Sequence, residues 1–172
     1  MIRLFGILLV MGATLWFGAY FAMKEKYRLQ ELEELERALI YLQGQISYLS
    51  ALLAEALESV SRKMNGQLGC IFQKAAEQMA AREGETAEEI WQKTWQEEGR
   101  HTFLTMEDMD ALLAFGRSLG YLDQTQQENS IRLLLRYIED ALTQGRKRLE
   151  KNSRLYYGMG CLSGLLIVVT LL

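Results

Sequence analysis

The chain has 172 residues, no proline and a formal net charge of −3 at pH 7. This length allows one domain, or a small domain with membrane anchors, and the absence of proline favours long helices, because proline interrupts them. Since no basic stripe with interleaved aromatic residues is present, we expect no binding to nucleic acid. Cys70 and Cys161 lie in segments of different character, so we expect them not to pair.

Two uncharged runs lie near the ends of the chain. Residues 4–23 form a run of 20 residues without a charge, and residues 155–172 form a run of 18. A helix rises about 1.5 Å per residue, so a bilayer core of about 30 Å requires about 20 residues. We therefore predict two transmembrane helices, at residues 3–23 and 154–172, that contact the lipid bilayer.

Each run has an alternative interpretation. The first could be a signal peptide, but its only preceding basic residue is Arg3, and no small-x-small cleavage site comes before Lys24. The second could be a core helix, but it has no polar face. An uncleaved anchor is therefore the better interpretation of both runs.

Basic residues flank the inner ends of both runs. They are Lys24, Lys26 and Arg28 after the first run, and Arg146, Lys147, Arg148, Lys151 and Arg154 before the second. Because cytoplasmic flanks collect lysine and arginine, we expect residues 24–153 to lie in the cytoplasm and both termini to lie outside it. The chain is then a two-pass protein of the cell membrane.

Apolar residues repeat at alternating spacings of three and four along the start of the middle segment. They are Leu32, Leu35, Leu39, Leu42, Ile46, Leu49, Leu53, Ala56 and Val60. This pattern predicts a helix that packs against another helix. The partner is either a second chain, which would make the protein a homomeric coiled-coil scaffold, or another helix of the same chain. We favour the second interpretation, because the other helical segments also need partners.

Glycines divide the rest of the middle segment into further helices. Gly66 and Gly69 indicate a turn, and Gly84 suits the end of the helix that follows. Gly99 and Gly120 are expected to end the next two helices. We therefore predict an all-α protein, in which a cytoplasmic bundle of about six helices, residues 24–153, lies between the two transmembrane helices.

Capping boxes are expected at the starts of these helices. Thr86 with Glu89 matches the pattern, and Thr105 with Asp108 is a weaker version of it. The last helix has two candidate pairs, Asp123 with Gln126 and Thr125 with Glu128, and the second pair is the closer match. In each case the side chains would satisfy backbone amides that have no partner at a helix start.

Trp91 and Trp95 lie one helical turn apart. A pair of large side chains at this spacing is typical of an anchor in a helical core. The alternative is a partner-binding patch, because tryptophan is enriched in interface hot spots.

The chain offers few residues for chemistry. His101 is the only histidine and lies in a predicted loop, and no cluster of histidine and cysteine has the spacing of a metal site. The carboxylates of residues 97–98 and 107–110 have no nucleophile beside them, and we expect them to be solvated or to favour helix starts. No phosphate-binding glycine loop is present. We therefore predict no enzyme activity, no cofactor and no metal.

Glycines interrupt the second uncharged run. They are Gly158, Gly160 and Gly164. A glycine-rich nucleotide turn needs a preceding strand, which is absent. Small residues four apart suit close packing of helices in lipid, so we expect these glycines to contact another membrane helix.

Several segments, taken in order, resemble stage III sporulation protein AB of endospore-forming bacteria. They are QISYLSALLAEAL (residues 45–57), TAEEIWQKTW (86–95) and LTMEDMDALLAFGRSLGYLDQTQQ (104–127), placed between glycine-containing membrane helices. The resemblance covers essentially the whole chain. No single segment is specific, whereas the ordered set with this length is.

The resemblance implies a shortened relative of the inner-membrane platform (F-family) proteins of type II secretion. It implies no enzyme activity and membership of a complex that links mother cell and forespore during endospore development. The implied partners are a cytoplasmic secretion-type ATPase and other membrane proteins of that complex. Localisation in the outer forespore membrane follows, with the bundle facing the mother-cell cytoplasm.

Two finer predictions follow from the same resemblance. The family fold implies a helix break near residues 48–51, with Ser50 as a candidate cap, although the apolar repeat continues through this region. We predict the break. As the docking face for the ATPase we select the acidic residues Glu88, Glu89, Glu97 and Glu98, and as further candidate partner contacts Trp91, Trp95 and Tyr121.

Overall fold

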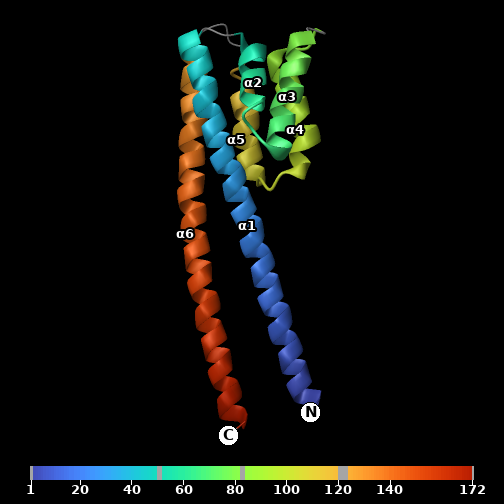
Figure 1. Cartoon of the computed structure of the whole chain (residues 1–172), viewed down its shortest axis with the longest axis vertical. Coiled ribbons are helices and arrows are strands. Elements are labelled where there is room, and N and C mark those ends of the chain that lie inside the picture. The colour runs from blue at the N-terminus through green and yellow to red at the C-terminus, as the bar shows by residue number, and fades with distance from the viewer. Residues whose placement is uncertain (1, 50–51, 82–83, 120–123, 172) are drawn as a thin grey trace. The chain divides into compact units, whose positions relative to one another are not determined.

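The computed structural model consists of helices throughout the residues that it describes. The backbone is described for residues 2–49, 52–81, 84–119 and 124–171, and the side chains for residues 20, 23–46, 52–81, 84–119 and 125–151. The elements are α1 (Ile2–Leu49), α2 (Leu53–Ser61), α3 (Gly66–Ala81), α4 (Ala87–Glu98), the 3-10 turn η1 (Gly99–His101), α5 (Met106–Gly116) and α6 (Gln124–Leu171) (Figure 1). The prediction of an all-α fold is confirmed.

The chain divides into two compact units. One contains residues Met1–Tyr27 and Thr143–Leu172, and the other contains Arg28–Leu142. The two uncharged runs lie in the first unit, within α1 and α6, and their side chains fall almost entirely outside the described residues. In the described part of the chain, no helix has a stretch that is both long and apolar enough to cross a membrane. The predicted transmembrane helices therefore stay predictions.

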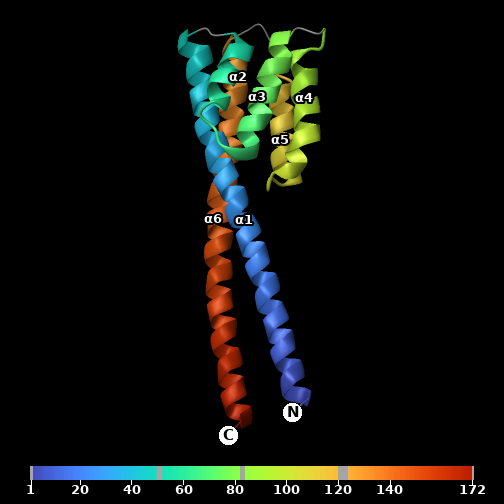
Figure 2. The same cartoon turned by 45° about the vertical axis from the view of Figure 1, so that its right-hand side comes forward.

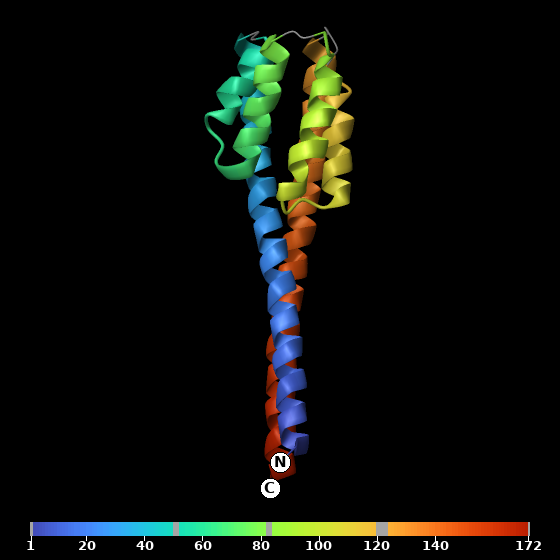
Figure 3. The ribbon, with the colours of Figure 1, turned by 90° about the vertical axis from the view of Figure 1, so that its right-hand side faces the viewer.

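The Arg28–Leu142 unit is an up-and-down bundle in which successive helices run in opposite directions (Figure 2). Along the chain, α2 packs on α3, α3 on α4 and α4 on α5. Figure 3 shows α2 beside α3 and α4 beside α5. Short connections favour this antiparallel arrangement, because neighbouring helices in the chain can then bury their apolar faces against one another.

The apolar repeat of α1 and α2 lies in the core of this unit. Leu32, Leu35, Leu39 and Leu42 are each at most 1% exposed. The last helix contributes a matching stripe, with Ile131, Leu134, Ile138 and Leu142 buried. The interpretation as packing within one chain is thus confirmed. At the described positions from Leu32 to Ile46, the side chains of this repeat are buried within the chain and so are not exposed to a second chain.

The helix break near residue 50 is confirmed, because α1 ends at Leu49 and α2 begins at Leu53. The cap assignment was wrong: the residue at the N-cap of α2 is Leu52, whose side chain makes no capping hydrogen bond. Ser50 lies outside the described residues. Both predicted capping boxes, at Thr86 and Thr105, are present with their reciprocal hydrogen bonds.

Two other predictions at helix ends need correction. Gly69 lies inside α3 and not in a turn, and it is needed there because a Cβ atom would lie 3.0 Å from the carbonyl oxygen of Met64. The last helix begins at Gln124, so Thr125 lies within it and cannot cap it together with Glu128. Gly120 and Asp123 lie outside the described residues. Gly84 has a φ of 89°, a left-handed conformation, but α3 ends at Ala81 and residues 82–83 lie outside the described residues, so its role as the end of that helix stays a prediction.

Candidate functional site

The acidic residues selected as a docking face form two pairs near opposite ends of α4. Glu88 and Glu89 lie in its first turn, and Glu97 and Glu98 end it. Nine residues separate Glu88 from Glu97, which corresponds to about 13 Å of helix. The four carboxylates therefore do not converge on one point.

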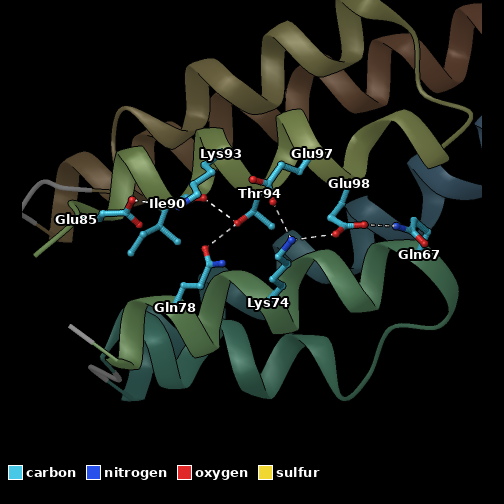
Figure 4. Close-up of polar contacts among 9 residues, drawn as sticks. All are labelled: Gln67, Lys74, Gln78, Glu85, Ile90, Lys93, Thr94, Glu97 and Glu98. Carbon is cyan, nitrogen blue, oxygen red and sulfur yellow. Dashed lines mark hydrogen bonds and ion pairs between the residues drawn. The ribbon is translucent and has the colours of Figure 1, made fainter. Parts of the chain in front are cut away.

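The Glu97–Glu98 pair surrounds a lysine of the neighbouring helix. Lys74 Nζ on α3 lies 2.9 Å from Glu97 Oε2 and 3.0 Å from Glu98 Oε1 (Figure 4). Gln67 donates a further hydrogen bond to Glu98 at 3.2 Å. Hydrogen bonds to Glu97 and Glu98 raise the pKa of Lys74, and the bond from Lys74 lowers the pKa of Glu98. This pair thus serves in part to join α3 to α4.

The Glu88–Glu89 pair serves the start of its own helix. Glu89 Oε2 accepts from the backbone N–H of Thr86 at 2.8 Å, and the Thr86 hydroxyl accepts from the Glu89 N–H at 3.2 Å. The backbone hydrogen bond from Thr86 lowers the pKa of Glu89. Glu88 accepts from the Gln92 side chain at 3.0 Å. Glu89 is exposed and Glu88 half-buried.

Trp91 and Trp95 lie in the core, where each is 0% exposed. Trp91 stacks edge-on against Phe72 and Phe115, with ring centroids 5.5 Å apart in both pairs, and its Nε1–H donates to the Leu112 carbonyl at 2.8 Å. Gly116 admits this ring, since a Cβ atom there would lie 2.3 Å from Trp91 Cδ1. The interpretation as a core anchor is confirmed. The alternative prediction, that Trp91 and Trp95 contact a partner, is corrected, because neither side chain has exposed surface.

The remaining candidate contacts are not described. Tyr121 lies outside the described residues, and Gly158, Gly160 and Gly164 lie in a part of α6 whose surroundings are not described. Their predicted roles stay predictions.

A buried polar cluster centres on Asp108, which is 1% exposed. Arg28, 6% exposed, donates from Nε to Asp108 Oδ2 at 2.6 Å and from Nη2 to Oδ1 at 2.8 Å. Tyr137 Oη donates to Oδ1 at 2.8 Å, and the Thr105 N–H and hydroxyl donate to Oδ2 at 2.8 and 2.7 Å. One carboxylate thus accepts five hydrogen bonds from α1, α6 and the start of α5.

The Asp108 cluster has the electrostatics of a structural ion pair. Burial by itself would raise the pKa of Asp108, but the hydrogen bonds from Arg28, Thr105 and Tyr137 outweigh it and hold the pKa below its ordinary value. Burial and the Asp108 carboxylate raise the pKa of Tyr137 well above its ordinary value. Asp108 therefore stays charged and Tyr137 neutral, so neither is poised near neutral pH for proton transfer.

This cluster was not predicted from the sequence. Arg28 was expected in the basic flank of a membrane helix, and Asp108 in a capping box or in solvent. The capping box is present, and the structure adds that both side chains are buried and paired. A signal was present: Arg28 continues the apolar repeat of α1, because it precedes Leu32 by four residues and Leu35 by seven. A cation on a buried stripe requires a buried acid as its partner.

The other candidate groups for chemistry are dispersed. His101, Glu107 and Asp110 are exposed, and so is Cys70. Within the described residues, no group of three or more histidine, cysteine, aspartate or glutamate side chains is arranged to hold a metal ion.

The chain is similar to known proteins in its family assignment, its sequence and its fold. The model of the family described as "Stage III sporulation protein AB" matches residues 3–172. The Stage III sporulation protein AB of Bacillus subtilis (strain 168) is 24% identical over 172 residues, which cover all of both chains. A solved structure of a Stage III sporulation protein AB has the same fold, with a TM-score of 0.67 at 20% identity over 72% of this chain and 97% of that chain. The chain belongs to the stage III sporulation protein AB family.

Proposed function

We propose that the chain is a non-enzymatic platform component of the complex that joins mother cell and forespore, and that it docks a cytoplasmic secretion-type ATPase through the exposed side of α4. The observation that carries this proposal is the combination on α4 of a rigid inner side and a charged outer side. Trp91 and Trp95 hold the inner side in the core. Other membrane proteins of the complex would contact the membrane helices.

The charge of this surface fits a basic partner. From Glu85 to Glu98 the chain has five glutamates. Among the described residues, two lysines pair with them, Lys93 with Glu85 at 3.2 Å and Lys74 with the Glu97–Glu98 pair. Glu89 and Glu97 remain exposed. A negative surface on a fixed helix attracts a positive patch and selects its orientation, although the gain in affinity is modest where the charges stay in water.

The docking proposal is tested by charge reversal of Glu88 and Glu97 together in the full chain. These two residues are chosen because Glu89 completes the helix cap and Glu98 still pairs with Lys74. We expect weaker co-purification of the ATPase, and the defect should diminish at high salt. The matched control reverses Glu139 and Asp140, which are exposed on α6 and give the same change in net charge. Equal recovery of the ATPase with both variants would contradict docking on α4.

The proposed location is the cell membrane, the outer forespore membrane during sporulation, with both termini outside the mother-cell cytoplasm. The uncharged runs support it, and so do the large exposed side chains at the end of the first run, Tyr20 (61% exposed) and Met23 (54%), and just after it, Tyr27 (41%). Tyrosine and lysine are enriched at the membrane–water interface, and Lys24 and Lys26 are exposed between these residues.

The topology is tested with the exposed native thiol of Cys70. In a Cys161→Ser chain in intact protoplasts, a membrane-permeant maleimide should label Cys70 and an impermeant one should not. An Ile2→Cys, Cys70→Ser, Cys161→Ser chain should show labelling by both reagents. Labelling of Cys70 by the impermeant reagent would reverse the proposed orientation.

A further inference from the structure

The connection between α4 and α5 carries two exposed apolar side chains. Met106 is 84% exposed and Phe103 is 40% exposed. Arg100 and His101 are exposed just before them. Single exposed apolar residues are normal on a protein surface. Here two lie on one short connection, and Met106 opens α5, a position that a polar residue would fill equally well.

This connection is fastened to α1 near the start of the Arg28–Leu142 unit. The Phe103 N–H donates to Glu31 Oε2 at 2.7 Å. Two residues after Met106, Asp108 is held by both nitrogens of Arg28 at 2.6 and 2.8 Å. The apolar pair therefore lies close to residues 28–31 of α1, and Figure 1 shows the α4–α5 connection at the end of the unit where α1 enters it.

Arg28 follows closely on the first uncharged run. Arg28 is five positions after Met23, the last residue of that run. Five positions along the chain span at most about 18 Å even when fully extended, and about 8 Å as a helix. The polar headgroup region is about 5–8 Å thick on each side of a bilayer. If the run spans the membrane, Arg28 therefore stays within about 18 Å of the hydrocarbon core, and the connection that is fastened to it is within reach of the headgroups.

We propose that Phe103 and Met106 form an interfacial contact with the phospholipid bilayer. This inference rests on the membrane location in the proposed function. Apolar side chains at the interface exchange water for acyl chains and glycerol. Arg100 favours anionic headgroups, whereas exposed Glu107 opposes them. The contact is therefore mainly apolar, and it fixes the bundle against the membrane in one orientation.

The proposal is tested by fluorescence quenching in full chains reconstituted in phosphatidylcholine–phosphatidylglycerol vesicles. An environment-sensitive fluorophore is attached at Met106→Cys in a Cys70→Ser, Cys161→Ser background. We expect a lipid with a nitroxide on its headgroup to remove most of the fluorescence at this position, with little change on adding salt. The matched position is Glu85→Cys, exposed beyond the far end of α4, where we expect little quenching.

A third label separates this inference from the membrane location itself. At Ala13→Cys, within the first uncharged run, a lipid with the nitroxide deep in its acyl chain should quench strongly. Quenching at Ala13 with equal, weak quenching at Met106 and Glu85 overturns the interfacial contact alone. Absence of quenching at Ala13 overturns both proposals. A Phe103→Ser change in the Met106→Cys chain should reduce the quenching, and unchanged quenching would remove Phe103 from the contact.

Discussion

The starts of α4 and α5 use the same capping motif for different purposes. At α4, Thr86 and Glu89 exchange hydrogen bonds in exposed positions. At α5, Thr105 and Asp108 make the same exchange, but Asp108 also receives Arg28 and Tyr137. The Thr86–Glu89 pair is therefore exposed to solvent, whereas the acid of the Thr105–Asp108 pair belongs to a buried ion pair.

The difference shows how a local motif becomes part of the tertiary structure. A capping box satisfies orphan backbone amides wherever it occurs. At α5 the acid also pairs with Arg28 and accepts from Tyr137, so that one carboxylate links α1, α5 and α6. Substitutions at the two sites should separate the local contribution from the tertiary one, and the changes below run from the largest expected effect to the smallest.

Replacing Asp108 with alanine should have the largest effect. It removes the buried carboxylate that accepts two hydrogen bonds from Arg28, and breaking a buried ion pair from one side costs about 3–5 kcal/mol. The measurement is the free energy of unfolding of the full chain in detergent micelles. Replacing both Arg28 and Asp108 with leucine should cost much less than Asp108→Ala, since no charge is left unpaired. A double variant that is less stable than the single one would contradict this account.

Replacing each capping threonine with alanine should compare the two motifs directly. Loss of an N-cap side chain costs about 1 kcal/mol, which is our expectation for Thr86→Ala. Thr105→Ala should cost more, because its hydroxyl also donates to Asp108 at 2.7 Å inside the cluster. Thermal unfolding midpoints of the two variants provide the comparison. Equal losses would mean that the α5 motif contributes only as a cap.

Replacing Tyr137 with phenylalanine should have a smaller effect. Asp108 keeps four of its five hydrogen bonds, so the loss is that of one hydrogen bond, about 0.5–1.5 kcal/mol. Tyr41→Phe is the matched control, because the Tyr41 hydroxyl lies 3.1 Å from the Ser59 hydroxyl in a less buried place. If Tyr137→Phe costs no more than Tyr41→Phe, the link from Asp108 to α6 contributes little.

Acid should remove the contribution of Asp108 gradually. Its pKa in the folded chain lies below the ordinary value, so its stabilisation is complete above that value and is lost as the pH falls through the folded pKa. The stability difference between the native chain and Asp108→Asn should therefore stay constant from about pH 7 to about pH 5 and shrink as the pH falls further. A difference that also stays constant at lower pH would indicate that the asparagine change acts through packing and not through charge.

Local patterns in the sequence were sufficient for the helices, the two capping boxes of α4 and α5 and much of the core. The repeat from Leu32 to Val60 predicted a buried stripe because a helix brings residues three and four apart onto one face. The Thr86 and Thr105 caps were predictable because a capping box involves only four consecutive positions. The family followed from ordered segments along the whole chain, and the match over residues 3–172 confirms it.

The tertiary structure decided which charges are buried and with what. Arg28 and Asp108 are 80 residues apart, and no local pattern indicates that α5 brings its capping acid to the start of the α1 stripe. Likewise, the sequence predicted Glu97 and Glu98 as part of an exposed acidic face, whereas in the structure Lys74 of α3 forms ion pairs with both. The pattern of side chains along a helix follows from covalent spacing, whereas the pairing of charges across helices follows only from how the bundle packs.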